Sequence, residues 1–163
     1  MLYYNVMSSP IGQLCLIKSH KGIRGILFSK FSSYEKYLQN KFPDEEITYN
    51  KLELKKATRQ INEYFNSSRK VFSLNTDIQL PSFYKKALYK VAEIPYGKTA
   101  SYKSIATKLE NPNASRAVGN ANANNPLPII IPCHRVIAND GNIGGYSGGL
   151  KTKRFLLELE CAL

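Results

Sequence analysis

The feature that most constrains this fold is a run of three short β-type segments at the start of the chain. They span residues 2–6, 13–17 and 23–28 and are rich in leucine, isoleucine, valine and tyrosine. Two turn sequences, Ser9-Pro10-Ile11-Gly12 and His20-Lys21-Gly22, separate them. Because such short connections cannot carry a crossover between parallel strands, consecutive strands must run antiparallel. The chain is therefore expected to begin as a β-meander.

Helical periodicity replaces the strand pattern after this meander. Apolar and aromatic side chains recur at helical spacing over residues 32–42 and 52–65, and Asn66-Ser67-Ser68 then interrupts the pattern. We predict a first lobe over residues 1–78, in which an antiparallel sheet is followed by helices. Since strands and helices are segregated along the chain, the predicted fold class is α+β.

Residues 79–163 are predicted to form a second, mainly helical lobe. Pro81 begins an amphipathic helix, and two shorter helices follow over residues 101–109 and 114–122. This pair predicts a helix-turn-helix, although a generic helical hairpin is the commoner structure for the pattern alone. Beyond it we expect an apolar strand over residues 125–132, a Gly-rich loop and a last helix.

The charge balance points to a polyanionic partner. Lys and Arg number 23 against 12 Asp and Glu, which gives a net charge of +11. A field of this size attracts nucleic acid at low salt, although a solvated lysine-rich surface is the alternative. The first lobe holds 12 basic and 7 acidic residues and the second 11 and 5, so composition does not locate a binding face.

Cysteine usage indicates a reducing compartment. Cys15, Cys133 and Cys161 are odd in number and form no CxxC pair, which argues against a disulfide framework or a structural zinc site. No segment approaches the roughly 18 apolar residues of a membrane span, and the start lacks the layout of a signal peptide. We therefore expect a cytoplasmic protein with no membrane partner, no metal and no cofactor.

One cysteine has neighbours that suggest reactivity. Cys133 follows an Ile-Ile-Ile-Pro run and precedes His134 and Arg135, residue types that lower the pKa of a thiol. It is the candidate nucleophile. The alternative is a buried, inert cysteine beside a hydrogen-bonded histidine.

The sequence around Cys133 resembles the active-site signature of the O6-alkylguanine-DNA alkyltransferases. The resemblance rests on Asn125-Pro126, Ile131-Pro132-Cys133-His134-Arg135-Val136, Gly145-Tyr146-Ser147-Gly148-Gly149-Leu150 and Glu160. Upstream segments match the DNA-binding half of that family in order and spacing: Ile94-Pro95-Tyr96-Gly97, Ser101-Tyr102 and Ser115-Arg116-Ala117-Val118-Gly119. The first lobe is similar to the family's ribonuclease-H-like N-terminal domain, which in some members binds zinc through two cysteines and two histidines. Here only Cys15 and His20 are present, so we expect no metal.

The resemblance implies direct reversal of DNA damage. An alkyl group would pass irreversibly from O6 of guanine to the sulfur of Cys133, once per molecule, because water does not hydrolyse a thioether. By family similarity His134 accepts the thiol proton through a water, Glu160 orients the imidazole and Tyr102 donates to the leaving base. Asn125 is expected to hold the turns around the nucleophile through side-chain hydrogen bonds.

The resemblance also implies a pocket for the base. Tyr146 and Pro128 would form its walls, and the loop carrying Ser147 and Gly148 would contact O6. Backbone carbonyl groups near Cys133 and Val136 would accept hydrogen bonds from the guanine amino group.

Double-stranded DNA carrying O6-alkylguanine is the implied partner, bound by a monomer, with cooperative assembly left open. Because O6 is buried in a stacked duplex, the nucleotide must be rotated out. The residues expected to contact DNA or to line its minor groove are Arg116, as the finger that replaces the base, Tyr102, Ser101, Ala117, Gly119, Ala121 and Arg135. Small residues on one helix equally suit close helix packing, and Arg135 would alternatively tie the lobes together.

Three other functions compete with this one. An alkyltransferase-like protein would bind the lesion without transfer, but there another residue replaces the nucleophile that Cys133 supplies here. A cysteine hydrolase would use Cys133 and His134 for acyl chemistry, yet the two are adjacent in sequence and we identify no oxyanion signature. A DNA-binding regulator would carry an incidental thiol.

Overall fold

The computed structural model describes residues 1–28 and 31–163. Within them the chain divides into two compact units, Met1–Gln79 and Leu80–Leu163, a division one residue from the expected lobe boundary. The elements are, in chain order, β1 (Leu2–Ser9), β2 (Gly12–Lys18), β3 (Ile23–Leu27), α1 (Tyr34–Lys41), β4 (Ile47–Tyr49), α2 (Lys55–Phe65), α3 (Ser82–Ala92), β5 (Ala100–Ser101), α4 (Tyr102–Lys108), α5 (Ser115–Ala123), the 3-10 helix η1 (Cys133–Arg135), β6 (Val136–Ile137) and α6 (Leu150–Leu159).

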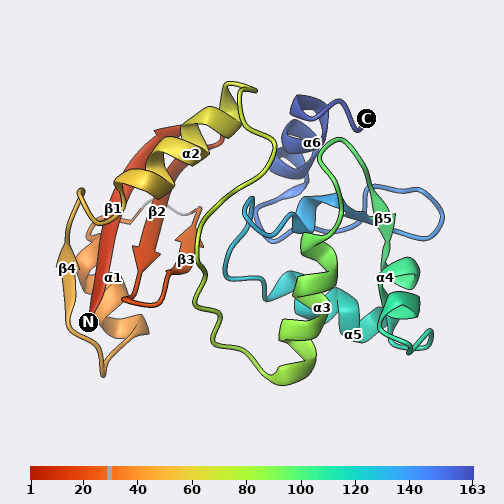
Figure 1. Ribbon diagram of the computed structural model, residues 1–163, viewed down its shortest axis with the longest axis horizontal. Coiled ribbons are helices and arrows are strands. Elements are labelled where there is room, and N and C mark those ends of the chain that lie inside the picture. Colours follow the sequence, from red (N-terminus) through yellow and green to blue (C-terminus); the bar gives the residue numbers. More distant parts are fainter. Residues whose placement is uncertain (29–30) are drawn as a thin grey trace. The chain divides into compact units, whose positions relative to one another are not determined.

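The first unit contains a four-stranded sheet in the order β3-β2-β1-β4 (Figure 1). The pairs β1–β2 and β2–β3 are antiparallel, which confirms the predicted meander. The expectation of a purely antiparallel sheet is wrong, because β4 pairs in parallel with β1, with Leu2 opposite Ile47. A three-residue strand with a single buried side chain is too short to produce an alternating pattern, so β4 could not be predicted from its own residues.

Helices cover this sheet from both sides. Leu2, Ile17 and Leu38 pack in one cluster on the α1 side, together with Tyr4 and Val6. Helix α2 lies across the sheet in Figure 1 and buries its own apolar stripe. Side chains alternate between the two faces of a strand. Asn5, which lies between Tyr4 and Val6 in β1, therefore faces α2 rather than α1.

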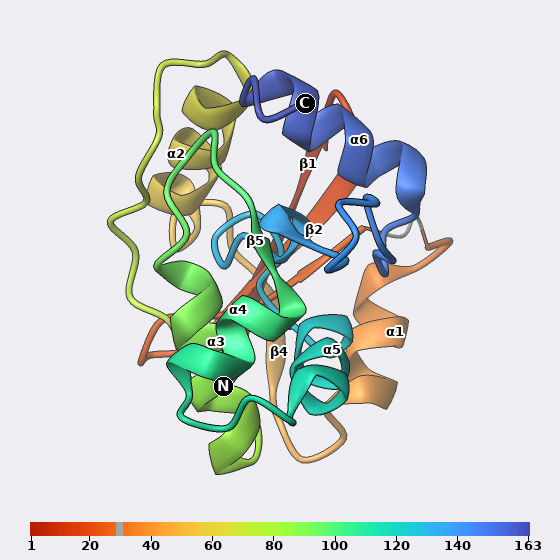
Figure 2. The same cartoon turned by 90° about the vertical axis from the view of Figure 1, so that its right-hand side faces the viewer.

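The second unit is built around α3. This helix contacts α4, α5 and η1 and buries Leu88 and Val91. Figure 2 shows α3, α4 and α5 gathered at one end of the unit and α6 at the other. The short helices α4 and α5 are in contact and are joined by a brief turn, as the sequence predicted.

The segment before Cys133 corrects one prediction. Residues 125–132 form turns instead of a strand, with the Ile131 amide donating to the Leu127 carbonyl at 2.8 Å. Ile129 adopts a φ of 76°, which is rare for a β-branched residue. Three of these eight residues are prolines, which lack the amide needed for a strand ladder. The turns lead directly into η1 and so fix the position of Cys133.

Neither a membrane-spanning helix nor a metal-binding group of side chains is found among the described residues. No helix there is both long and apolar enough to cross a bilayer. No three His, Cys, Asp or Glu side chains within residues 1–28 and 31–163 gather in a way that would hold a metal ion.

Candidate active site

A pair of two-residue strands brings the start of α4 beside η1. Strands β5 and β6 are parallel, with Ala100 opposite Val136 and Ser101 opposite Ile137. The Ser101 hydroxyl accepts a hydrogen bond from the Ser104 amide at 3.0 Å and so caps α4. This pairing places Tyr102, the first residue of α4, next to the segment that carries Cys133.

A cavity of about 320 Å³ lies beside these elements. Its walls are formed by Tyr102, Gly119, Asn122, Ala123, Gly145, Tyr146 and Ser147. Three residues expected to hold the base, Tyr102, Tyr146 and Ser147, are therefore brought together. Two others, Pro128 and Gly148, are not among the residues that line it.

Cys133 is 1% exposed and is not itself a lining residue. Two lining residues nevertheless contact it directly. The Asn122 side-chain amide donates to the Cys133 carbonyl at 3.1 Å, and the Tyr146 side chain forms a hydrogen bond with the thiol. The sulfur therefore lies behind the cavity lining, next to Tyr146 and sheltered from bulk solvent.

Burial raises the pKa of the Cys133 thiol above its usual value. A hydrogen bond from Asn125, the positive charge of Lys153 and the hydrogen bond with Tyr146 act in the opposite direction. The sequence argument expected the neighbours of Cys133 to lower this pKa overall, and that expectation is wrong. Loss of hydration disfavours the thiolate more than the polar neighbours favour it.

Asn125 organises the turns as predicted. Its amide nitrogen donates to the Ile131 carbonyl at 2.9 Å, and its Oδ1 accepts from the Leu127 amide at 3.0 Å. Both contacts close the loop that precedes Cys133, and the same side chain favours the thiolate.

His134 and Glu160 form a buried pair. Nε2 of the imidazole lies 2.6 Å from Oε2 of the carboxylate, and the residues are 0% and 3% exposed. Because a carboxylate only accepts, Nε2 carries the hydrogen and Nδ1 keeps its lone pair. Nδ1 has no hydrogen-bond partner among the described residues. Burial lowers the pKa of His134, although Glu160 opposes this, so the ring is neutral and able to take a proton.

Arg135 has a structural role that replaces the predicted DNA contact. It is 6% exposed, its Nε donates to Oε1 of Glu160 at 2.7 Å, and another guanidinium nitrogen donates to the Ile94 carbonyl at 2.6 Å. Its guanidinium also lies over the Tyr96 ring. These partners belong to the second unit, and they neutralise the buried carboxylate that orients His134.

Lys153 is a site residue that sequence reasoning missed. It is 0% exposed, and its Nζ donates to the carbonyls of Val136 at 2.6 Å and Gly145 at 3.1 Å. Burial lowers its pKa to about 8. The signal was present, because a lysine stands on the stripe of α6 that also carries the buried Leu156 and Leu157. The Val136 carbonyl, expected to read the base, already accepts this hydrogen bond.

Asn122 was missed as well, because an asparagine within the run Asn120-Ala121-Asn122-Ala123-Asn124 carries no distinguishing signal. It is 6% exposed and also hydrogen-bonds the side chain of Tyr102, which links Tyr102 to Cys133 through a single side chain.

The residues expected to meet DNA fall into two groups on α5. Arg116 is exposed near the start of the helix, and Ala117 and Gly119 are partly exposed. Ala121 is 0% exposed, so the packing interpretation applies to it and the DNA contact does not. Helix α5 also forms part of the cavity wall, through Gly119, Asn122 and Ala123. The cavity beside Cys133 therefore lies against the helix that carries the exposed Arg116.

Comparison with known proteins identifies both units. Residues 2–78 match the family model described as "6-O-methylguanine DNA methyltransferase, ribonuclease-like domain", and residues 82–162 match the same family's "DNA binding domain". The fold and the site thus define a two-domain protein with a ribonuclease-like domain and a DNA-binding domain that carries a buried cysteine.

Relatives match over nearly the whole chain. The methylated-DNA--protein-cysteine methyltransferase of Methanosarcina barkeri is 41% identical over 98% of this chain and 97% of its own length. The crystal structure of the O6-methylguanine methyltransferase of Mycobacterium tuberculosis has a TM-score of 0.87 at 36% identity, covering 99% of this chain and 94% of that one. A structure of the M. tuberculosis protein in complex with DNA has a TM-score of 0.85 at 35% identity, covering 98% and 93%. The chain belongs to the 6-O-methylguanine DNA methyltransferase family.

Proposed function

We propose that this protein repairs DNA by transferring an alkyl group from O6 of guanine to the sulfur of Cys133. One observation supports this most strongly: a buried cysteine is hydrogen-bonded to Tyr146, which lines a cavity of about 320 Å³, and is followed by a histidine that is paired with a carboxylate. That volume suits a single base with its substituent. A soft sulfur nucleophile suits attack at a saturated carbon.

The proposed step exchanges one bond for another. The bond between the Cys133 sulfur and the alkyl carbon forms as the bond between that carbon and O6 breaks. The thiol proton passes through a water molecule to Nδ1 of His134, and Glu160 stabilises the imidazolium that results. Guanine leaves as an anion and takes a proton from solvent, which in turn recovers the proton held by His134. Burial raises the pKa of Tyr102, so its hydroxyl stays protonated and is able to donate to the base.

The product is a thioether, so each molecule acts once. No water-driven route restores the thiol, and the protein is consumed in proportion to the lesions it repairs. Cys15, Cys133 and Cys161 are free. We place the reaction in the cytoplasm, where such thiols stay reduced.

Access to O6 requires the nucleotide to leave the duplex. We propose that α5 enters the minor groove through Ala117 and Gly119, and that Arg116 fills the space left by the base. Contacts of this kind tolerate any sequence, as repair demands. A single copy holds every residue used in the step, so we propose that the protein acts as a monomer.

The proposal is tested by mixing the protein with duplex DNA that contains O6-methylguanine and weighing the intact protein. The mass should rise by one methyl group and saturate at one equivalent of DNA. Continuous turnover would favour the hydrolase instead. Binding without a change of mass would favour an alkyltransferase-like protein or a regulator.

Arg116→Ala tests the finger role. Because Arg116 is needed only to hold an extruded base, its loss should slow reaction with duplex DNA about tenfold or more while reaction with free O6-methylguanine stays the same. The comparison requires single-turnover rates on both substrates. Equal losses on duplex and free base would contradict the assignment.

A further inference from the structure

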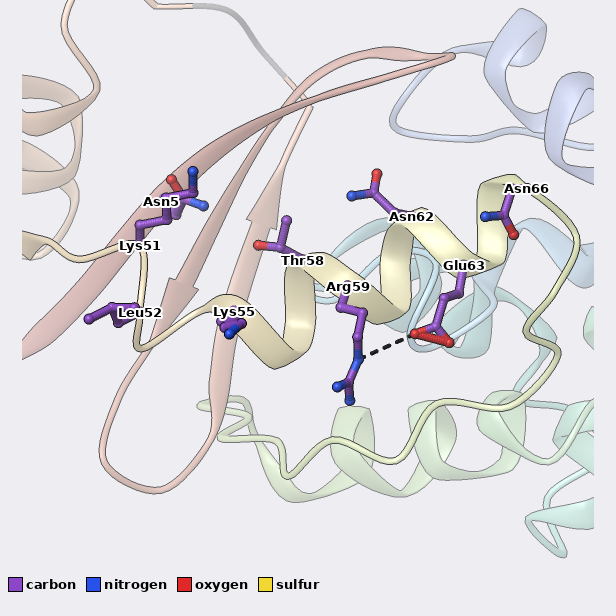
Figure 3. Close-up of a pocket in the computed structure, with 9 residues that line it drawn as sticks. All are labelled: Asn5, Lys51, Leu52, Lys55, Thr58, Arg59, Asn62, Glu63 and Asn66. Atoms are coloured by element: carbon purple, nitrogen blue, oxygen red, sulfur yellow. Dashed lines mark ion pairs between the residues drawn. The ribbon is translucent and has the colours of Figure 1, made fainter.

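A second hollow, which we term the α2 cavity, lies wholly within the first unit. Its volume is about 600 Å³, against about 320 Å³ for the cavity beside Cys133. Figure 3 shows the residues that line it, which come from one stripe of α2, from the segment after β4 and from β1: Asn5, Lys51, Leu52, Lys55, Thr58, Arg59, Asn62, Glu63 and Asn66. The proposed alkyl transfer uses none of them.

One shielded polar group in the wall of the α2 cavity has no hydrogen-bond partner. Oγ1 of Thr58 is buried from solvent and is unpaired among the described residues. Asn5 lies on the face of β1 that meets α2 and is 4% exposed. Buried polar groups in native proteins are nearly always hydrogen-bonded, so the unpaired Thr58 hydroxyl indicates that a ligand supplies the missing partner.

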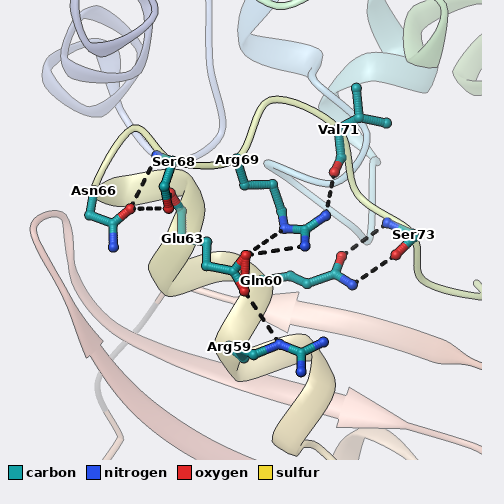
Figure 4. Close-up of polar contacts among 8 residues, drawn as sticks. All are labelled: Arg59, Gln60, Glu63, Asn66, Ser68, Arg69, Val71 and Ser73. Carbon is teal, nitrogen blue, oxygen red and sulfur yellow. Dashed lines mark hydrogen bonds and ion pairs between the residues drawn. The ribbon is translucent and has the colours of Figure 1, made fainter.

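Two cations of the α2 cavity, Lys51 and Lys55, are available to a ligand. Lys51 and Lys55 form no ion pair within the described part of the chain, and Arg59 lies 3.3 Å from a Glu63 oxygen. Figure 4 shows that Arg69, which is not a lining residue, binds the same carboxylate through two nitrogens at 3.2 and 3.1 Å. Since Arg69 neutralises the one acid present, the lining has a net positive charge.

In another hollow of the first unit, the lining lysine is paired with an acid, unlike Lys51 and Lys55. This hollow measures about 230 Å³ and is lined by Lys18 and Glu53, which form an ion pair at 2.7 Å. There the lysine is satisfied by the protein itself. Within residues 1–28 and 31–163, no acidic side chain forms such an ion pair with Lys51 or Lys55 of the α2 cavity.

We propose that the α2 cavity binds a nucleotide through its phosphate. Lys51, Lys55 and Arg59 supply the positive charge that a phosphate requires. Asn5 and Asn62 offer both donors and acceptors, which suit the edge of a base. The volume lies within the roughly 300–1,000 Å³ of small-molecule sites. The nucleotide is either free or part of a DNA strand, and both sources present the same chemistry.

Titration calorimetry of the full chain with thymidine 5′-diphosphate tests this proposal, since the reaction centre is proposed to take guanine. We expect saturable binding that the double variant Lys55→Glu, Arg59→Glu weakens about tenfold or more. The matched control is Lys36→Glu, an exposed charge reversal on α1, which should leave affinity within about twofold. Absent binding, or an equal loss in the control, would overturn the proposal. Equally tight binding of inorganic pyrophosphate would overturn the nucleotide assignment.

Asn5→Leu gives an independent test. It removes the side-chain amide and keeps a side chain of similar size, so nucleotide affinity should fall while the unfolding temperature stays about the same. Retained affinity would contradict the role of Asn5. Comparing a short oligothymidine with thymidine diphosphate identifies the source, because tighter binding of the oligomer indicates a DNA strand. Reaction with free O6-methylguanine should be unchanged in every variant, which separates this site from the proposed alkyl transfer.

Discussion

Two cysteines of this protein are equally buried and differ in what surrounds them. Cys15 lies in the sheet of the first unit at 0% exposure, and Cys133 lies in η1 at 1%. Burial alone raises the pKa of Cys15 to about 12. Burial also raises the pKa of Cys133, but Asn125, Lys153 and Tyr146 counteract it.

The comparison shows that shelter and reactivity are separate properties. A desolvated thiol is protected from solvent in both units, but only Cys133 has donors and a cation that would stabilise a thiolate as it forms. Its resting state is the thiol, so the thiolate need exist only during transfer. The polar groups around Cys133 therefore raise the rate of transfer by stabilising the thiolate as it forms. They do not keep the sulfur ionised at rest.

The largest effect on the transfer rate is expected when the Cys133 sulfur is removed, and removal of the Cys15 sulfur is the control. Cys133→Ala should abolish alkyl transfer while DNA binding persists. Cys15→Ala, the matched control, should leave the rate unchanged and lower the free energy of unfolding by about 1 kcal/mol, because it removes one buried atom. Transfer rates and denaturant unfolding measure both. Transfer that survives in Cys133→Ala would remove the distinction between the two cysteines.

The next largest effect on the transfer rate is expected when the positive charge of Lys153 is removed. This charge acts on Cys133, whereas among the described residues no such charge acts on Cys15. Lys153→Met keeps the buried stem and removes the charge, so the transfer rate at neutral pH should fall roughly tenfold, the size of one neighbouring charge on an ionisation. Lys151→Met, an exposed change on the same helix, is the control and should have no effect.

The pH dependence of the rate distinguishes this role from a packing defect. In the unaltered protein the rate should rise with pH, because the raised pKa of Cys133 keeps the thiol protonated at neutral pH. The rise should flatten above about pH 8, where Lys153 loses its charge. Lys153→Met should show no flattening, and a profile parallel to that of the unaltered protein would contradict the electrostatic role.

The smallest effect is expected at Tyr146. Tyr146→Phe removes one hydrogen bond to the thiol while the ring still lines the cavity, so the rate should fall about threefold, the effect of one such bond. Tyr89→Phe, at an exposed tyrosine of α3, is the control. An unchanged rate would show that Tyr146 serves only as a wall of the pocket.

Much of the fold was predictable because the spacing of apolar residues along the sequence shows which face of a helix or strand is buried. The three strands of the meander and all six helices lie where alternation and helical spacing placed them. Strand β4 was not predictable, since its position depends on pairing with β1 and not on its own three residues. The turns over residues 125–132 were mistaken for a strand because an apolar run conceals the effect of its prolines.

The site was predictable where residue types are distinctive. The pair of His134 and Glu160 came from the family resemblance, and the structure brings the two side chains into contact across 26 positions. Arg135 and Ala121 were predicted to contact DNA, but both side chains are buried. The sequence around them does not show whether a side chain points to the core or to solvent. Lys153 was overlooked because a lysine is normally a solvated residue, and only its place on an apolar stripe marks it as buried.

The most direct test of the account is to locate the transferred group among the three free cysteines. After reaction with DNA containing O6-methylguanine, the protein is digested and its peptides are sequenced by tandem mass spectrometry. We expect one methyl group, found only on Cys133. Methylation of Cys15, or of the exposed Cys161, with Cys133 unmodified would contradict it.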